Sequence, residues 1–172
     1  METNPQVQEA LKTLENVMVR QFRLLQELLN LSHEERDALT HSDAEMLMPT
    51  VERKEALLDQ IVLLEDQRRM QVEVLSHHFN ITEAQTSILA LLPHIPSPRS
   101  ERLQRLSEGI LSLATQIRDI NSHNALLVNN ALEWVASAQE FILSLYTQPT
   151  GYGPMGYAPA SPAVSGDINQ IV

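Results

Sequence analysis

The sequence predicts an all-α protein: an elongated antiparallel helical bundle or coiled coil of three long helices and one short helix, with a disordered C-terminal tail. Aromatic residues make up only 4% of the chain and there are 5 glycines, so helix formers prevail and few stretches suit a strand. Apolar residues recur at heptad spacing over most of the chain. After residue 147 the composition changes to Gly, Pro, Tyr and Ala. We therefore expect a helical domain at 1–147 and a flexible tail at 148–172.

The first helix is expected to start at the N-terminus, with Asn4 as N-cap and Pro5 at the first helical position. Apolar residues then follow at steps of three and four, interrupted by Gln21 and ending near Leu39. The members of this stripe are Val7, Leu11, Leu14, Met18, Leu25 and Leu28.

A second long helix follows after the short polar connection at 40–42, which makes the two helices antiparallel neighbours. Ser42 is expected to be its N-cap, forming a capping box with Glu45. Pro49 predicts either a kink or a restart of the helix with this proline in its first turn. The apolar heptad positions are Leu47, Val51, Leu58, Ile61, Val72, Leu75 and Phe79, with Leu57 and Leu64 beside them. The charged residues in this stripe, which predict ion pairs or snorkelling at a wet edge, are Lys54, Glu65 and Arg68.

The short third helix is expected at 83–92, capped by Thr82. Three prolines between 93 and 98 end it, because proline cannot continue a helix. Ser97 and Pro98 then repeat the combination of a cap and a proline that starts a helix, and the long final helix follows.

The final helix carries the stripe around which the rest of the chain is organised. Its positions, at alternating steps of three and four, are Leu103, Leu106, Ile110, Leu113, Ile117, Ile120, Asn124, Leu127, Ala131, Trp134, Ala138, Phe141 and Leu145. All are apolar except Asn124. A buried Asn in such a stripe specifies helix register or oligomeric state. The alternative is that the packing of this helix ends at Asn124.

A second apolar stripe appears beside the first one only after Asn124. It comprises Ala125, Val128, Leu132, Val135, Ile142 and Tyr146, interrupted by Gln139. Before Asn124 the same register holds Arg118 and Asn121. The last turns of the helix are therefore apolar over a wider arc than the first turns. Further packing within the molecule explains this, and a groove for a partner helix explains it equally well.

Composition argues against several functions. The formal net charge of −10 disfavours binding to nucleic acid or to an anionic membrane surface. The chain has no cysteine, no basic and apolar leader at its N-terminus and no apolar run long enough to span a bilayer, so we expect a soluble cytoplasmic protein. No two histidines are four residues apart, no Glu precedes a His by three, and no phosphate-binding glycine loop occurs. We expect no catalytic residue, no metal site and no cofactor.

Several motifs together resemble one family. The first is the Leu-rich stretch at 24–69, with Glu34-Glu35-Arg36-Asp37-Ala38-Leu39, a turn containing Ser42 and Asp43, and Glu52-Arg53-Lys54-Glu55-Ala56-Leu57-Leu58. The second is the late helix with Asn121, Asn124, Leu126-Leu127 and Leu132, followed by Tyr152-Gly153-Pro154-Met155-Gly156. In this order the motifs resemble the FlgN family, the flagellar type III export chaperones for hook-associated proteins. Ala125, where the family often has a basic residue, and Pro49 depart from the family pattern.

The resemblance implies a cytoplasmic chaperone that holds FlgK and FlgL, the hook-filament junction proteins, through their C-terminal helical segments and delivers them to the export gate protein FlhA. The residues expected to contact the client are Asn124, Leu127, Val128, Ala131, Leu132, Trp134, Val135, Ala138, Phe141, Ile142 and Leu145. The tyrosines that are candidates for docking to the gate are Tyr146, Tyr152 and Tyr157. A structural coiled-coil or adaptor protein that self-associates, for instance as a homodimer, would use the same stripe, and a helical-bundle enzyme is the weaker class.

Overall fold

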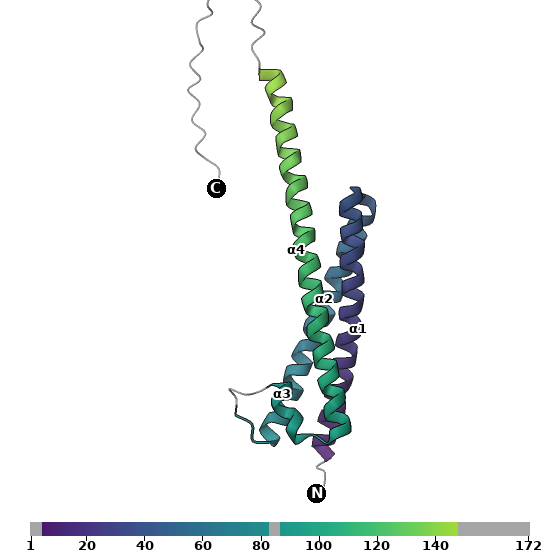
Figure 1. The fold of residues 1–172 in the computed structure, drawn as a ribbon, viewed down its shortest axis with the longest axis vertical. Helices are drawn as coiled ribbons and strands as arrows, with labels where there is room; N and C mark the ends of the chain where they lie inside the picture. The colour runs from purple at the N-terminus through teal and green to yellow at the C-terminus, as the bar shows by residue number, and fades with distance from the viewer. Residues whose placement is uncertain (1–4, 83–86, 148–172) are drawn as a thin grey trace, which may run out of the picture. The chain divides into compact units, whose positions relative to one another are not determined.

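The computed structural model describes residues 5–82 and 87–147, with side chains through Leu145. Within these residues all regular structure is helical, which confirms the all-α prediction there. The elements are α1 (Pro5–His41), α2 (Ala44–His78), α3 (Ile88–Leu91), the 3₁₀ turn η2 (Leu92–His94) and α4 (Ser97–Thr147) (Figure 1). The chain divides into two compact units, Met1–Leu132 and Glu133–Val172. The expected tail at 148–172 lies outside the described residues.

The turn between α1 and α2 differs from the prediction at its cap. Ser42 has a positive φ of 55° and ends α1, while the Asp43 amide donates to the Ala38 carbonyl at 2.8 Å. The N-cap of α2 is Asp43 and not Ser42, because the Asp43 carboxylate accepts from the Met46 amide at 3.0 Å. A residue in the left-handed region closes the preceding helix and is not in the extended conformation that an N-cap requires. α1 therefore continues two residues beyond the expected end.

Pro49 lies inside α2, which runs without interruption from Ala44, so the helix does not restart at this proline. The Pro49 nitrogen has no hydrogen to donate to the preceding turn. The Thr50 hydroxyl next to it donates to the Met46 carbonyl at 2.8 Å and is buried. This side-chain bond adds to the hydrogen bonding of the first turns of α2.

The buried side of α2 also differs from the predicted heptad. Leu58, which the heptad placed in the stripe, is exposed, whereas its neighbour Leu57 and the later Leu64 are buried. The sequence has two adjacent leucines at 57–58 and again at 63–64, so periodicity alone does not choose between them. Packing against the other helices makes the choice.

The third helix is shorter than predicted. α3 starts at Ile88, and Ser87 is its N-cap in place of Thr82, with the Ser87 hydroxyl accepting from the Ala90 amide at 3.2 Å. Residues 83–86, the predicted start of this helix, lie outside the described residues. In α4 the Ser97 hydroxyl donates to Glu101 Oε1 at 2.7 Å, and the Pro96 carbonyl accepts the first helical hydrogen bonds.

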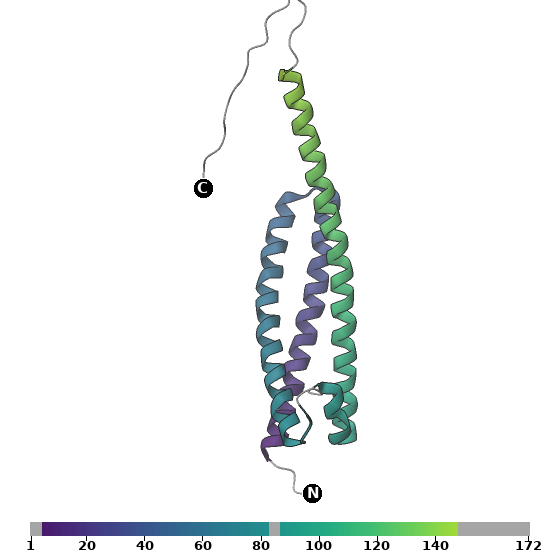
Figure 2. The same cartoon turned by 90° about the vertical axis from the view of Figure 1, so that its left-hand side faces the viewer.

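Within the first unit, α1, α2 and the early part of α4 lie side by side (Figures 1 and 2). Gln21 of α1 bonds Glu65 of α2, and Glu34, farther along α1, bonds Arg53, which lies earlier in α2. These two helices are therefore antiparallel. One core cluster contains Leu11, Leu14, Met18, Val72, Leu75, Ile88, Leu91 and Leu103. A second contains Leu25, Leu28, Leu31, Leu57, Leu113 and Ile117.

Glycine allows a close approach of α4 to α1. A Cβ atom at Gly109 would lie 2.7 Å from the Phe22 ring. Any larger residue at this position would push the ring out of its place. Gly109 is therefore favoured by packing against Phe22 and not by backbone conformation.

Candidate functional site

The predicted stripe on α4 is buried only in its first part. Leu103, Leu113, Ile117 and Ile120 are buried in the first unit, and Asn124 is the last buried residue among the side chains of α4 that are described, which end at Leu145. Burying a large apolar side chain contributes about 1.5–3 kcal/mol, so this part of α4 is held firmly to α1 and α2. After Asn124, no described side chain of the helix is buried.

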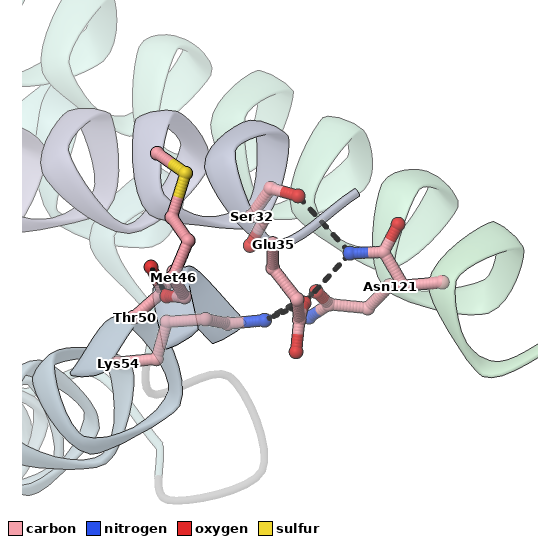
Figure 3. A network of polar contacts seen from close by, with 7 residues as sticks. Ser32, Glu35, Met46, Thr50, Lys54 and Asn121 are labelled. Carbon is pink, nitrogen blue, oxygen red and sulfur yellow. Dashed lines mark hydrogen bonds and ion pairs between the residues drawn. The ribbon is translucent and has the colours of Figure 1, made fainter. Parts of the chain in front are cut away.

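A network of polar side chains joins the three long helices where this burial ends (Figure 3). The Lys54 ammonium on α2 pairs with the Glu35 carboxylate on α1 and donates to Asn121 Oδ1 on α4 at 3.1 Å. Asn124, which is only 4% exposed, donates to the Ser32 carbonyl at 3.0 Å and to Glu35 Oε2 at 2.6 Å. The network fixes the register of α4 against α1 and α2 at this level.

A buried polar residue in a heptad stripe predicts a side chain that fixes helix register. Asn124 has this role, because its side-chain amide bonds Ser32 and Glu35 of α1. The end of burial on α4 coincides with the same residue. The predicted ion pairs at Lys54 and Arg68 are also present, to Glu35 and Glu65 respectively. The Lys54 pair is not at a wet edge, because its side chains are only 11% and 17% exposed.

The rest of α4 within the first unit carries exposed apolar side chains. Leu126, Val128 and Leu132 are all exposed, as are the smaller Ala125 and Ala131. Leu127 is half-buried. This segment continues the helix with an apolar surface that the first unit does not cover.

The second unit contains the last turns of α4, and its described side chains form an amphipathic helix by themselves. Trp134, Val135, Phe141, Ile142 and Leu145 are exposed, and Trp134 is exposed to 75%. At 100° per residue they share one side of the helix with the half-buried Ala138. The opposite side carries Glu133, Ser137, Glu140 and Ser144.

The Asp, Glu, Lys and Arg residues in this part of α4 are all acidic. Between residues 119 and 145 the acidic side chains are Asp119, Glu133 and Glu140, and there is no Lys or Arg. His123 is the one histidine in this range, and its ring bonds the Asp119 carbonyl of its own helix at 2.7 Å. The apolar surface is thus bordered by negative charge and by uncharged polar groups.

The predicted client-contact residues fall into three groups. Val128, Ala131, Leu132, Trp134, Val135, Phe141, Ile142 and Leu145 are exposed, Leu127 and Ala138 are half-buried, and Asn124 is buried. Of the tyrosines, Tyr152 and Tyr157 lie outside the described residues, and the side chain of Tyr146 is not described. Sequence reasoning missed Leu126 and Leu143, which are also exposed and lie outside both apolar stripes.

Nothing in the described residues indicates catalytic chemistry. No group of three His, Asp or Glu side chains among them is placed to hold a metal ion. His94 stacks on Phe79 with ring centroids 5.3 Å apart, which is a packing role. Among the described helices none combines the length and the apolar character that crossing a bilayer requires.

A chain whose described regular structure is helical, with exposed apolar side chains on its longest described helix, has the features of a protein that binds other proteins. The sequence profile described as "FlgN protein" matches residues 1–160. The chain belongs to the FlgN family, and this membership indicates a role as a chaperone in flagellar export. No curated protein and no solved structure is significantly similar to the chain.

Proposed function

We propose that this protein is a flagellar type III export chaperone for the hook-associated proteins FlgK and FlgL. It binds their C-terminal helical segments, prevents their premature association and delivers them to the export gate protein FlhA. Membership of the FlgN family supports the chaperone role. The client contacts are Leu127, Val128, Ala131 and Leu132 in the first unit, and Trp134, Val135, Ala138, Phe141, Ile142 and Leu145 in the second.

The observation that carries this proposal is the exposure of large apolar side chains on α4 after Asn124. Trp134 and Phe141 are 75% and 64% exposed, although both are among the side chains that gain most from burial. Exposed aromatic residues on an amphipathic helix are typical of helix-in-groove recognition. A client helix with an apolar face and a polar or basic rim would cover them, because this part of α4 has no positive charge.

The size of this surface suits a client that must later be released. Five large side chains in the second unit would gain about 7.5–15 kcal/mol on burial, at about 1.5–3 kcal/mol each. Association itself costs about 4–15 kcal/mol. The two are similar in size, so we expect a specific but reversible complex, which a carrier requires.

Delivery to the export gate would involve aromatic residues close to the client-binding segment. Tyr146 and, beyond the described residues, Tyr152 and Tyr157 are the candidates. A tyrosine offers a large apolar ring and one hydroxyl, a combination that favours protein interfaces.

Substitutions on α4 test the client surface. Trp134→Ala is expected to weaken binding of purified FlgK or FlgL by about thirtyfold or more, because removing a central aromatic contact costs about 2 kcal/mol or more. Leu127→Asp is expected to abolish binding, because it places a charge in an apolar contact. Titration calorimetry measures both.

The matched control is Leu111→Asp, the same change on the same helix at a leucine that is 69% exposed and outside the proposed surface. This variant should bind the client normally. Circular dichroism verifies that each variant is folded. Normal client binding by folded Trp134→Ala and Leu127→Asp variants would show that the client surface lies elsewhere.

Permanent self-association is the alternative use of the same side chains. An adaptor protein would hide the apolar part of α4 in a tight homodimer. Sedimentation of the purified chain separates the two functions, because an export chaperone must leave this surface accessible to its client. A dimer that persists at nanomolar concentration and excludes FlgK and FlgL would favour the adaptor.

A further inference from the structure

A second exposed apolar surface lies on α2, on the side opposite to its buried residues. Val62, Leu63, Met70 and Val74 are each more than half exposed. At 100° per residue they fall within about one third of the helix circumference. The buried side chains of α2 point the other way and include Leu57, Leu64, Val72 and Leu75. We call the exposed side the outer face of α2.

Acidic residues alternate with these apolar residues along the outer face. Asp59 and Asp66 lie between and beside the apolar side chains, with Glu55 and Glu73 on the same side of the helix. All four are exposed, and no ion pair among the described residues involves them. The outer face therefore combines apolar area with uncompensated negative charge.

The basic residues of α2 do not neutralise this face. Lys54 and Arg68 are on the inner side of the helix, where they pair with Glu35 and Glu65. Arg53 points toward α1 and pairs with Glu34. Arg69 lies at the edge of the outer face. Three of the four Lys and Arg residues of α2 thus pair with Glu34, Glu35 or Glu65, and only Arg69 stands beside the four exposed carboxylates.

We propose that the outer face of α2 is a docking surface for another protein that presents a basic amphipathic helix. Such a helix would cover Val62, Leu63, Met70 and Val74 with its apolar side and place Lys or Arg beside Asp59 and Asp66. Opposite charges across the rim speed association and fix the register of the two helices. This surface is separate in the sequence from the client contacts on α4, and the proposal does not depend on them.

Charge decides among the alternative occupants. A second copy packed through the same face would bring the same carboxylates together, and like charges at an interface disfavour binding. The chain's own C-terminal part has no Lys or Arg from residue 119 to its end. At the start of α4, Arg99 and Arg102 both contact Glu15, which leaves Arg105 as the one exposed arginine there without an ion pair among the described residues. We therefore assign the basic helix to a different protein, because a second copy carries the same net charge of −10 and one arginine does not make a basic helix.

Peptide binding to the full chain tests this inference. The probe is a synthetic helical peptide of about five turns with Leu on one side and Lys on both flanks, and the matched peptide has Glu in place of each Lys. Fluorescence anisotropy at low salt measures affinity. We expect the Lys peptide to bind at least tenfold more tightly than the Glu peptide, and its affinity to fall with added salt.

Two double variants locate the site. Asp59→Lys with Asp66→Lys should weaken binding of the Lys peptide by about tenfold or more. The control, Glu9→Lys with Glu27→Lys, makes the same change in net charge at exposed positions of α1 and should bind within about twofold of the unchanged chain. Leu63→Ser with Met70→Ser should also weaken binding, since it removes apolar contact.

Equal losses in the two charge variants would overturn the inference, because attraction to net negative charge would then suffice. Unchanged binding by Leu63→Ser with Met70→Ser, or equal affinity for the two peptides, would also overturn it. All peptide titrations use Trp134→Ala as the background, because the client surface on α4 would also accept an apolar helix with a basic rim. The Asp59→Lys with Asp66→Lys variant should bind FlgK or FlgL as the unchanged chain does. Peptide binding and client binding are thus measured separately, so either proposal can fail while the other stands.

Discussion

At the scale of single residues, Lys54 and Glu35 form the least exposed of the ion pairs among the described residues. Both side chains are largely removed from water, and Glu35 also accepts from Asn124. A charge left without its partner in such a place costs far more than an exposed one. We therefore expect this position to be the most sensitive polar site of the first unit.

Lys54→Met is expected to lower the free energy of unfolding by about 2–4 kcal/mol, because it leaves the Glu35 carboxylate without its counter-charge. Chemical denaturation measures this loss. The control is Arg53→Met on the neighbouring residue, whose pair with Glu34 also joins α2 to α1 but has side chains 59% and 40% exposed. The control should cost at most about 1 kcal/mol. Equal effects would show that burial does not govern the strength of these pairs.

At the scale of the helix, the Glu65 side chain forms hydrogen bonds both within α2 and across to α1. Its carboxylate accepts from Arg68 on the next turn and from the Gln21 amide at 3.0 Å. The hydrogen bond from Arg68 lowers the pKa of Glu65 below its ordinary value of 4.5, against the opposing effect of burial, and the bond from Gln21 lowers it further. The carboxylate is thus favoured in the folded state.

A pH dependence follows from this lowered pKa. Because the folded state holds the proton less tightly than the unfolded state, the contribution of Glu65 to stability is fully present above pH 4.5 and is lost as pH falls through the lower folded pKa. The unchanged chain should be more stable than Glu65→Gln at pH 7, and this difference should shrink as pH falls below 4.5. Parallel denaturant titrations at both pH values measure it. A constant difference would contradict the assignment.

The helices also show how far sequence determines this fold. The stripe on α4 and the widening of its apolar arc after Asn124 were predictable, because periodicity is a local property. The buried side of α2 was not, because adjacent leucines at 57–58 and 63–64 fit either register. The contact of Asn124 with Ser32 was not predictable either. It joins residues far apart in sequence, and only the packed helices bring them together.

The candidate site was predictable to a similar extent. An apolar arc wider than one packing face indicates a spare surface, and the exposed side chains from Val128 to Leu145 match that indication. The outer face of α2 was missed, because Asp59 and Asp66 interrupt the apolar spacing of Leu63, Met70 and Val74. The common side of these residues becomes evident only when the opposite side of the helix is known to be buried. Negative charge on that side is the sequence signal that could have pointed to it.

At the scale of the whole molecule, α4 is one continuous helix with buried side chains in its first part and exposed side chains in its last turns. As far as Asn124, its apolar side chains are anchored in the two core clusters of the first unit. From residue 133 to residue 145 no side chain is buried. These turns extend a helix that is already nucleated, but extension in water adds little free energy per residue, and most helical stability in proteins comes from tertiary packing. Local stability should therefore differ sharply between the two parts.

Amide hydrogen exchange measures that difference. Amides at 133–147 are expected to exchange at least tenfold faster than those at 103–124, because opening a segment without buried contacts needs little free energy. Saturating FlgK or FlgL should slow exchange at 133–147 and leave 103–124 almost unchanged, since a bound client helix would bury Trp134, Phe141 and their neighbours. Leu111→Asp serves as the control and should show the same protection. Uniform slow exchange along the whole of α4 in the free chain would mean that the last turns already have a partner, such as a second copy. In that case the client would have to displace this partner before it could bind.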